Sequence, residues 1–63
     1  MPVVMVEMWE GRTVEQKKQL AEDITAAFVK IGTPQEAVQI ILKDNPKHNW
    51  VKGGKLASEY TSQ

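Results

Sequence analysis

The sequence contains no cysteine and only one histidine among its 63 residues. The chain can therefore form neither disulfides nor thiolate metal sites, and the single His48 argues against a structural zinc site. No apolar run approaches the roughly 20 residues needed to cross a bilayer. No basic start followed by an apolar stretch indicates a signal peptide. We therefore expect a soluble, cytoplasmic protein that binds no metal.

The chain also has no excess of positive or negative charge. The chain carries eight basic and eight acidic residues, whereas small nucleic-acid-binding domains usually have a strong basic excess. Neither a nucleic acid nor a membrane is expected as a partner.

The length predicts one domain, residues 1–63, with little core of its own. Below about 70–80 residues a single core rarely supplies more than roughly 3–5 kcal/mol, so small proteins usually need an additional stabilising device. Disulfides are excluded, and the single histidine argues against a structural zinc site. Self-association remains, and we expect a homo-oligomer.

The first segment, residues 2–9, is rich in strand-forming residues. Its apolar side chains are Val4, Val6 and Met8 on one face and Val3 and Met5 on the other. A strand that is apolar on both faces is typical of a covered, partly parallel sheet. Gly11 then interrupts the pattern and predicts a turn.

The next segment carries the signals of a helix. Thr13 and Gln16 have the spacing of a capping box, in which each side chain bonds the other residue's backbone amide. Apolar residues then recur at helical spacing: Leu20, Ala21, Ile24, Ala27, Phe28 and Ile31. Gly32 can take the left-handed conformation that ends a helix, and Pro34 prevents its continuation.

The remaining chain completes the predicted fold. Residues 33–36 repeat a helix start, with Pro34 as the first helical residue, but allow only one turn. Residues 38–43 form a second strand, and Gly53-Gly54 permits a hairpin between two very short strands. The prediction is an α/β protein with a single βαβ unit and a short carboxy-terminal β-hairpin. Its open strand edges and apolar sheet face should pair with other copies to form an oligomer.

Most familiar catalytic groupings are missing, but three segments resemble one family. There is no cysteine nucleophile and no phosphate-binding glycine loop. The matching residues are Pro2-Val3-Val4, Glu10-Gly11-Arg12-Thr13 with Glu15-Gln16-Lys17, and Trp50 before Gly53-Gly54 and Leu56-Ala57-Ser58. Over nearly its full length the chain resembles the 4-oxalocrotonate tautomerase family.

This resemblance implies a cofactor-free isomerase that interconverts the keto and enol forms of a small unsaturated 2-oxo or 2-hydroxy acid. Removal of Met1 would expose the secondary amine of Pro2 as the general base. A terminal amine has a pKa of about 7.7–8.0, which apolar surroundings and a nearby cation lower. Arg12 would hold a carboxylate or the developing enolate, and Trp50 would supply an apolar wall. The family assembly implied is a hexamer, built as a trimer of dimers.

The chain departs from the family at Gln39, where the best-known members have a second arginine that binds the far carboxylate of the substrate. Gln39 can still contact the substrate by hydrogen bonding, and Lys52 could restore the missing charge. Two alternatives remain open: a proline-based dehalogenase or hydratase of the same fold, or a non-catalytic oligomer subunit. Trp9 is interpreted as a packing or interface residue, and His48 as a solvated loop residue.

Overall fold

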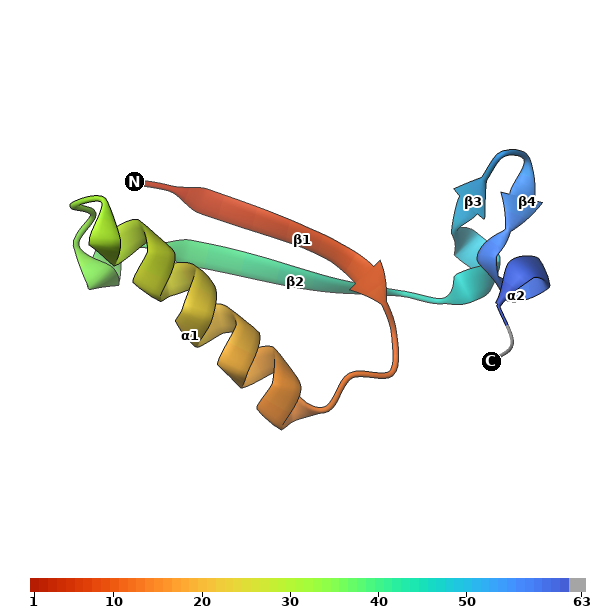
Figure 1. Cartoon of the computed structure of the whole chain (residues 1–63), viewed down its shortest axis with the longest axis horizontal. Coiled ribbons are helices and arrows are strands. Elements are labelled where there is room, and N and C mark those ends of the chain that lie inside the picture. Colours follow the sequence, from red (N-terminus) through yellow and green to blue (C-terminus); the bar gives the residue numbers. More distant parts are fainter. Residues whose placement is uncertain (62–63) are drawn as a thin grey trace.

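The computed structural model describes residues 1–61. Its larger part is a βαβ unit made of β1 (Val3–Trp9), α1 (Val14–Lys30) and β2 (Gln39–Asn45). β1 and β2 pair in parallel, with Val3 opposite Gln39 and Trp9 opposite Asn45. In Figure 1, α1 lies along one side of this two-stranded sheet. The predicted βαβ unit is confirmed.

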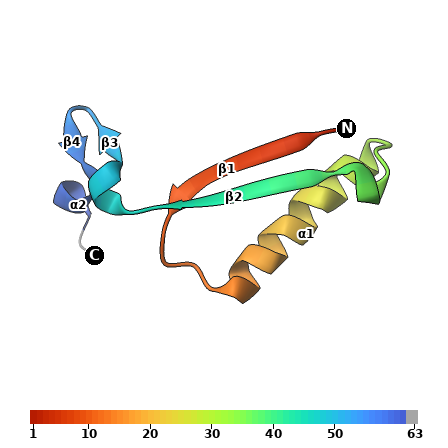
Figure 2. The ribbon, with the colours of Figure 1, turned by 180° about the vertical axis from the view of Figure 1, so that it is seen from behind.

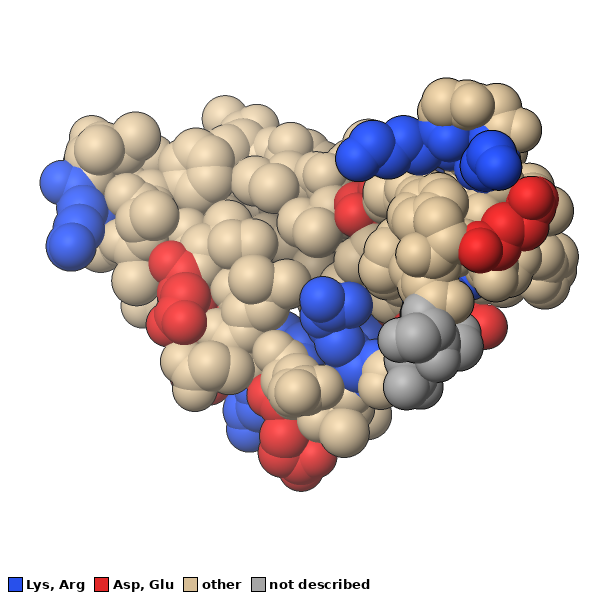
Figure 3. All heavy atoms as spheres, turned by 45° about the vertical axis from the view of Figure 1, so that its right-hand side comes forward, with Lys and Arg blue, Asp and Glu red and all other residues tan. Residues whose placement is uncertain are grey.

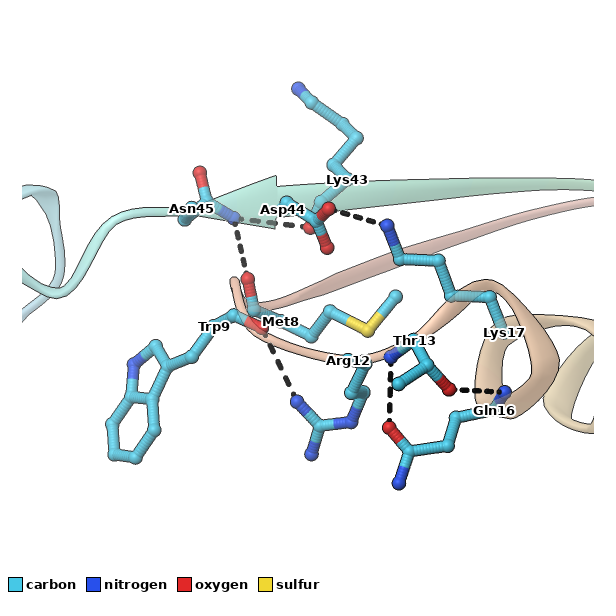
Figure 4. Close-up of polar contacts among 9 residues, drawn as sticks. All are labelled: Met8, Trp9, Arg12, Thr13, Gln16, Lys17, Lys43, Asp44 and Asn45. Atoms are coloured by element: carbon cyan, nitrogen blue, oxygen red, sulfur yellow. Dashed lines mark hydrogen bonds and ion pairs between the residues drawn. The ribbon is translucent and has the colours of Figure 1, made fainter. Parts of the chain in front are cut away.

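The start of α1 follows the predicted capping box. The Gln16 amide donates to Thr13 Oγ1 at 3.1 Å, and the Thr13 amide donates to Gln16 Oε1 at 2.9 Å (Figure 4). One turn later, Lys17 Nζ contacts Asp44 Oδ2 at 2.5 Å and ties the helix to β2. The helix ends at Lys30 with Ile31 as its C-cap, and Gly32 has a φ of 103°, as the sequence predicted.

The segment between α1 and β2 differs slightly from the prediction. Its single turn is a 3-10 helix over Gln35–Ala37, and Pro34 precedes it in an extended conformation, with ψ at 140°. Pro34 therefore caps this turn and is not its first helical residue. β2 also continues to Asn45, because the Asn45 carbonyl accepts from the Glu10 amide at 3.0 Å.

The remaining residues form a small carboxy-terminal unit. It consists of η2 (Lys47–Asn49), β3 (Val51–Lys52), β4 (Lys55–Leu56) and α2 (Ala57–Tyr60). The antiparallel β3–β4 pair confirms the predicted hairpin, whereas the two short helices were not predicted. Figure 2 shows this unit at the end of the sheet that is remote from the amino terminus. Within residues 1–61 no helix is both long and apolar enough to cross a membrane.

The sheet has one covered face and one open face. Within residues 1–61 only Met8 and Ala57 are buried apolar residues. On the face away from Met8, Val3 is 53% exposed, Met5 61% and Ile41 47%. The radius of gyration is 14.7 Å, against about 11 Å for a compact domain of this length. This open apolar face fits the expectation that the chain associates with other copies.

Candidate active site

Pro2 and Gln39 lie together at the start of the parallel sheet. The Gln39 amide donates to the Pro2 carbonyl at 3.0 Å. The Gln39 side chain turns back to the amino terminus, where its Nε2 donates to Met1 Sδ at 3.2 Å. The parallel register therefore places a side-chain amide beside the residue predicted to be the base.

Arg12 lies beyond the other end of β1. Gly11, with a φ of 119°, turns the chain after the strand, and Arg12 Nη1 then donates to the Trp9 carbonyl at 3.2 Å. Figure 4 shows the guanidinium directed back to the strand end, where it bonds the Trp9 carbonyl. This hydrogen bond holds the only arginine of the chain close to the end of the sheet.

The Trp9 ring organises the contacts between the strand end and the carboxy-terminal unit. Trp50 packs edge-on against it with ring centroids 5.9 Å apart and an interplanar angle of 77°. Tyr60 lies at 6.5 Å, and Lys47 Nζ lies over the Trp9 ring, 5.0 Å from its centroid. The interpretation of Trp9 as a packing residue is confirmed. By packing against Trp9, Trp50 lies at the same end of the sheet as Arg12.

A shallow depression of about 660 Å³ opens beside Arg12. Its lining residues come from the loop after β1, the first turn of α1, η2 and α2: Glu10, Gly11, Arg12, Gln16, Lys47, His48 and Ser58. His48 is exposed, as expected, but it lies in η2 at the edge of this depression. Lys47, which the sequence pattern did not single out, also lines this depression.

A polar cluster on the open sheet face stabilises the charged form of Glu7. Asn45 Nδ2 donates to Glu7 Oε1 at 2.9 Å, and Lys43 Nζ lies 3.5 Å from Glu7 Oε2. The hydrogen bond from Asn45, supported by the charge of Lys43, lowers the pKa of Glu7 against a smaller opposing effect of desolvation. This carboxylate therefore stays ionised beside the exposed apolar residues.

The candidate residues form two pairs, separated by the length of β1. Pro2 and Gln39 lie at its start, and Arg12 and Trp50 lie at its end (Figure 1). Seven residues of strand at about 3.3 Å each span roughly 23 Å. The fold therefore does not bring Pro2 and Arg12 of one chain together. Within residues 1–61, no three histidine or acidic side chains gather as a metal site would require.

The chain is thus a small α/β protomer with two candidate residues at each end of its sheet. The sequence pattern of the family described as Tautomerase enzyme matches residues 2–60, and the chain belongs to this family. A probable tautomerase of Streptococcus pneumoniae is 42% identical over 60 residues, covering 94% of this chain and 100% of the relative. A 2-hydroxymuconate tautomerase of Comamonas testosteroni is also 42% identical, over 94% of this chain and 95% of that protein.

Solved structures show the same fold. TomN, a 4-oxalocrotonate tautomerase homologue of the tomaymycin biosynthetic pathway, superposes with a TM-score of 0.89 at 37% identity, covering 92% of this chain and 91% of TomN. A heterohexamer 4-oxalocrotonate tautomerase from Chloroflexus aurantiacus gives 0.87 at 32% identity, over 97% of this chain and 100% of that one. The fold is thus that of the 4-oxalocrotonate tautomerases, and family membership supports tautomerase-type catalysis.

Proposed function

We propose that the protein is a cytoplasmic, cofactor-free isomerase that interconverts the enol and keto forms of a small unsaturated 2-hydroxy or 2-oxo acid, with the amine of Pro2 as the general base. The observation that carries this proposal is the extent of the family match, which begins at residue 2. The similarity to a 2-hydroxymuconate tautomerase supports the same class of substrate.

The proposed base requires removal of Met1. While Met1 is attached, the Pro2 nitrogen is an amide without a basic lone pair. Once exposed, the secondary amine removes the proton of the 2-hydroxyl group and returns a proton to a carbon of the conjugated chain. The substrate gains a carbonyl group and loses one double bond from the conjugated diene, with no change in its atoms. A base whose pKa lies near the working pH is best suited to both transfers.

Arg12 supplies the charge that such a reaction needs. Its guanidinium binds a carboxylate or the developing enolate through paired, charge-assisted hydrogen bonds. Trp50 adds an apolar wall, and the Gln39 amide hydrogen-bonds the substrate next to Pro2. This arrangement requires Arg12 and Trp50 to come from a neighbouring chain, because roughly 23 Å of strand separates them from the Pro2 of their own chain.

The proposed assembly is a homo-oligomer, with a hexamer of three dimers as the form suggested by the family. Two features of the chain support it: the exposed Val3, Met5 and Ile41 on the open sheet face, and the division of the candidate residues between the two ends of β1. A similar chain from Chloroflexus aurantiacus belongs to a heterohexamer.

The test is ketonisation of 2-hydroxymuconate, followed by absorbance, with protein shown by intact mass to lack Met1. We expect a rate well above that of buffer. The matched control carries one additional amino-terminal residue, so that Met1 stays attached to Pro2. This control should be inactive because its Pro2 nitrogen is an amide. Equal rates for the processed and the blocked protein would refute the role of Pro2. No rate with this diacid or with enol phenylpyruvate would favour the non-catalytic alternative.

A further inference from the structure

Glu7 and Lys43 form a charged row across the open face of the sheet. We propose that this row selects a second copy of the chain as the partner that covers the face, with Glu7 of one copy paired with Lys43 of the next. The inference rests on the proposed homo-oligomer and makes it more specific, because it names the polar contacts that fix how the copies meet. Apolar burial alone is non-directional and would not choose among partners.

The charged row lies on the same face as the exposed apolar residues. In the parallel register Met5 lies opposite Ile41, and Glu7 lies opposite Lys43. Because alternate residues of a strand point to the same face, these two rows are neighbours on the open face. Figure 4 shows the Lys43 side chain extending away from the helix. A partner that covers Met5 and Ile41 would therefore also contact Glu7 and Lys43.

Both charged side chains can form a second ionic contact. Lys43 Nζ lies 3.5 Å from Glu7 Oε2, and the two side chains are 52% and 47% exposed. Asn45 Nδ2 donates to the other oxygen, Glu7 Oε1, at 2.9 Å and holds the carboxylate in place on its own chain. A carboxylate offers about four acceptor sites, and an ammonium group has several N–H donors. The contacts within the chain therefore leave capacity on both members of the pair.

A face that carries an anion and a cation on adjacent strands is complementary to itself. In a two-fold pairing each Glu7 can face Lys43 of the other copy, and the same contact can repeat around a closed ring. A partner without this row would bury two ionised side chains and add no contact to either, which is unfavourable. Val3, Met5 and Ile41 supply the exposed apolar area, and Figure 3 shows a broad stretch of uncharged side chains along β1. Apolar burial thus provides the attraction, and the charged row provides the specificity.

The experiment uses two charge reversals, Glu7→Lys and Lys43→Glu. Each reversal gives the row a single sign, so copies of one variant repel one another across the interface. For each variant we expect the protein concentration at which half of the chains are assembled to rise about a hundredfold, because like charges that meet in an interface are strongly unfavourable. Light scattering over a range of protein concentrations measures this shift.

A mixture of the two variants separates a contact between copies from a contact within one chain. One variant presents a positive row and the other a negative row, so equal amounts should assemble together at concentrations where neither assembles alone. A contact confined to one chain would stay broken in both variants, and mixing would recover nothing. Native mass spectrometry, with one variant isotopically labelled, shows whether the oligomers contain both. The matched controls are Glu36→Lys on η1 and Lys55→Glu on β4, which make the same charge changes outside the open face and should assemble like the wild type.

A doubly reversed chain provides a second test if the single variants do not fold. Glu7→Lys/Lys43→Glu keeps an ion pair within the chain and should assemble with itself like the wild type. It should not enter oligomers with the wild type, because the contacts of the row across such an interface would join like charges.

Four results would overturn the inference. They are a wild type that remains monomeric, which would leave the face to another partner; unchanged assembly in both charge reversals; a mixture that recovers nothing; and a doubly reversed chain that mixes freely with the wild type. Assembly is measured without turnover, so these results are separate from the ketonisation assay. An active wild type with unchanged assembly in the reversals would refute the charged row and retain the proposed function. A wild type that assembles as inferred but does not turn over the substrate would refute only the proposed function.

Discussion

Two inactive variants of this chain should recover activity when they are assembled together. Pro2→Ala removes the proposed base, which should cost about 10²–10⁴ in rate. Arg12→Ala removes the charge proposed to stabilise the enolate, which should cost about 10²–10³ in rate. Each variant keeps the group that the other lacks, and roughly 23 Å of strand separates the two positions in one chain. A site that combines one residue from each of two chains can therefore be rebuilt by mixing.

The fraction of activity recovered follows from random mixing of the two variants. In oligomers assembled from equal amounts of the two variants, half of the sites receive an intact Pro2, and half of those receive an intact Arg12 from the neighbour. About a quarter of the wild-type activity should therefore return, for any symmetric assembly in which the site lies between two chains. The assay is ketonisation of 2-hydroxymuconate after refolding the variants together from denaturant, with native mass spectrometry to show that mixed oligomers have formed.

A second mixture tests the same geometry from the other direction. The double variant Pro2→Ala/Arg12→Ala is refolded with an equal amount of wild type. If the site lies between two chains, about a quarter of the sites remain complete; if it lies within one chain, about half do. No recovery in the first mixture, together with one half in the second, would refute the division of the site.

Three other predictions concern the sheet face, the helix cap and the polar cluster. Met5→Lys should dissociate the oligomer, because Met5 is 61% exposed on the open apolar face and a lysine there would place a charge in the interface. Light scattering after gel filtration measures the mass of the assembly, with Met5→Leu as the control. An unchanged mass in Met5→Lys would contradict the prediction. Thr13→Ala should lower the free energy of unfolding by about 1 kcal/mol, measured by urea denaturation; a loss equally large in Thr13→Ser would not be a capping effect. Asn45→Ala should raise the pKa of Glu7, whose lowering depends first on the hydrogen bond from Asn45, and an NMR titration of the carboxyl would show it. Because folding lowers the pKa of Glu7, the ionised Glu7 stabilises the fold at any pH above the ordinary glutamate pKa. This stabilisation is lost as the pH falls through the lowered pKa of the folded state. A pH–stability profile that is the same in Asn45→Ala as in the wild type would contradict this role of Glu7.

Local signals explain why most of the βαβ unit could be predicted. Thr13 and Gln16 are three residues apart, and Gly32 follows the last apolar residue of the helical pattern. Both ends of α1 are therefore determined by residues that are close in sequence. The two strands could be predicted from their β-branched and apolar residues alone. The exact start of the turn at Gln35 and the continuation of β2 to Asn45 depended on pairing with distant residues, which the local pattern does not contain.

The site was less accessible from the sequence, because its geometry depends on contacts across the fold. The resemblance identified Pro2, Arg12, Gln39 and Trp50 as candidates. It did not show that they divide into two pairs, which follows from the parallel register of β1 and β2. The position of Lys47 over the Trp9 ring depends on how η2 folds back against the end of β1, a contact between residues 38 positions apart.

The separation of Pro2 from Arg12 has a consequence for how such a gene could diverge. In the proposed assembly each chain contributes the base to one site and the arginine to another, so the two contributions are under separate constraint even though one sequence encodes both. After a duplication, one copy could lose its proline and the other its arginine, and the pair would still form complete sites wherever the two copies meet. Specialised, mutually dependent subunits are therefore accessible from this fold by single losses, without any new residue having to arise.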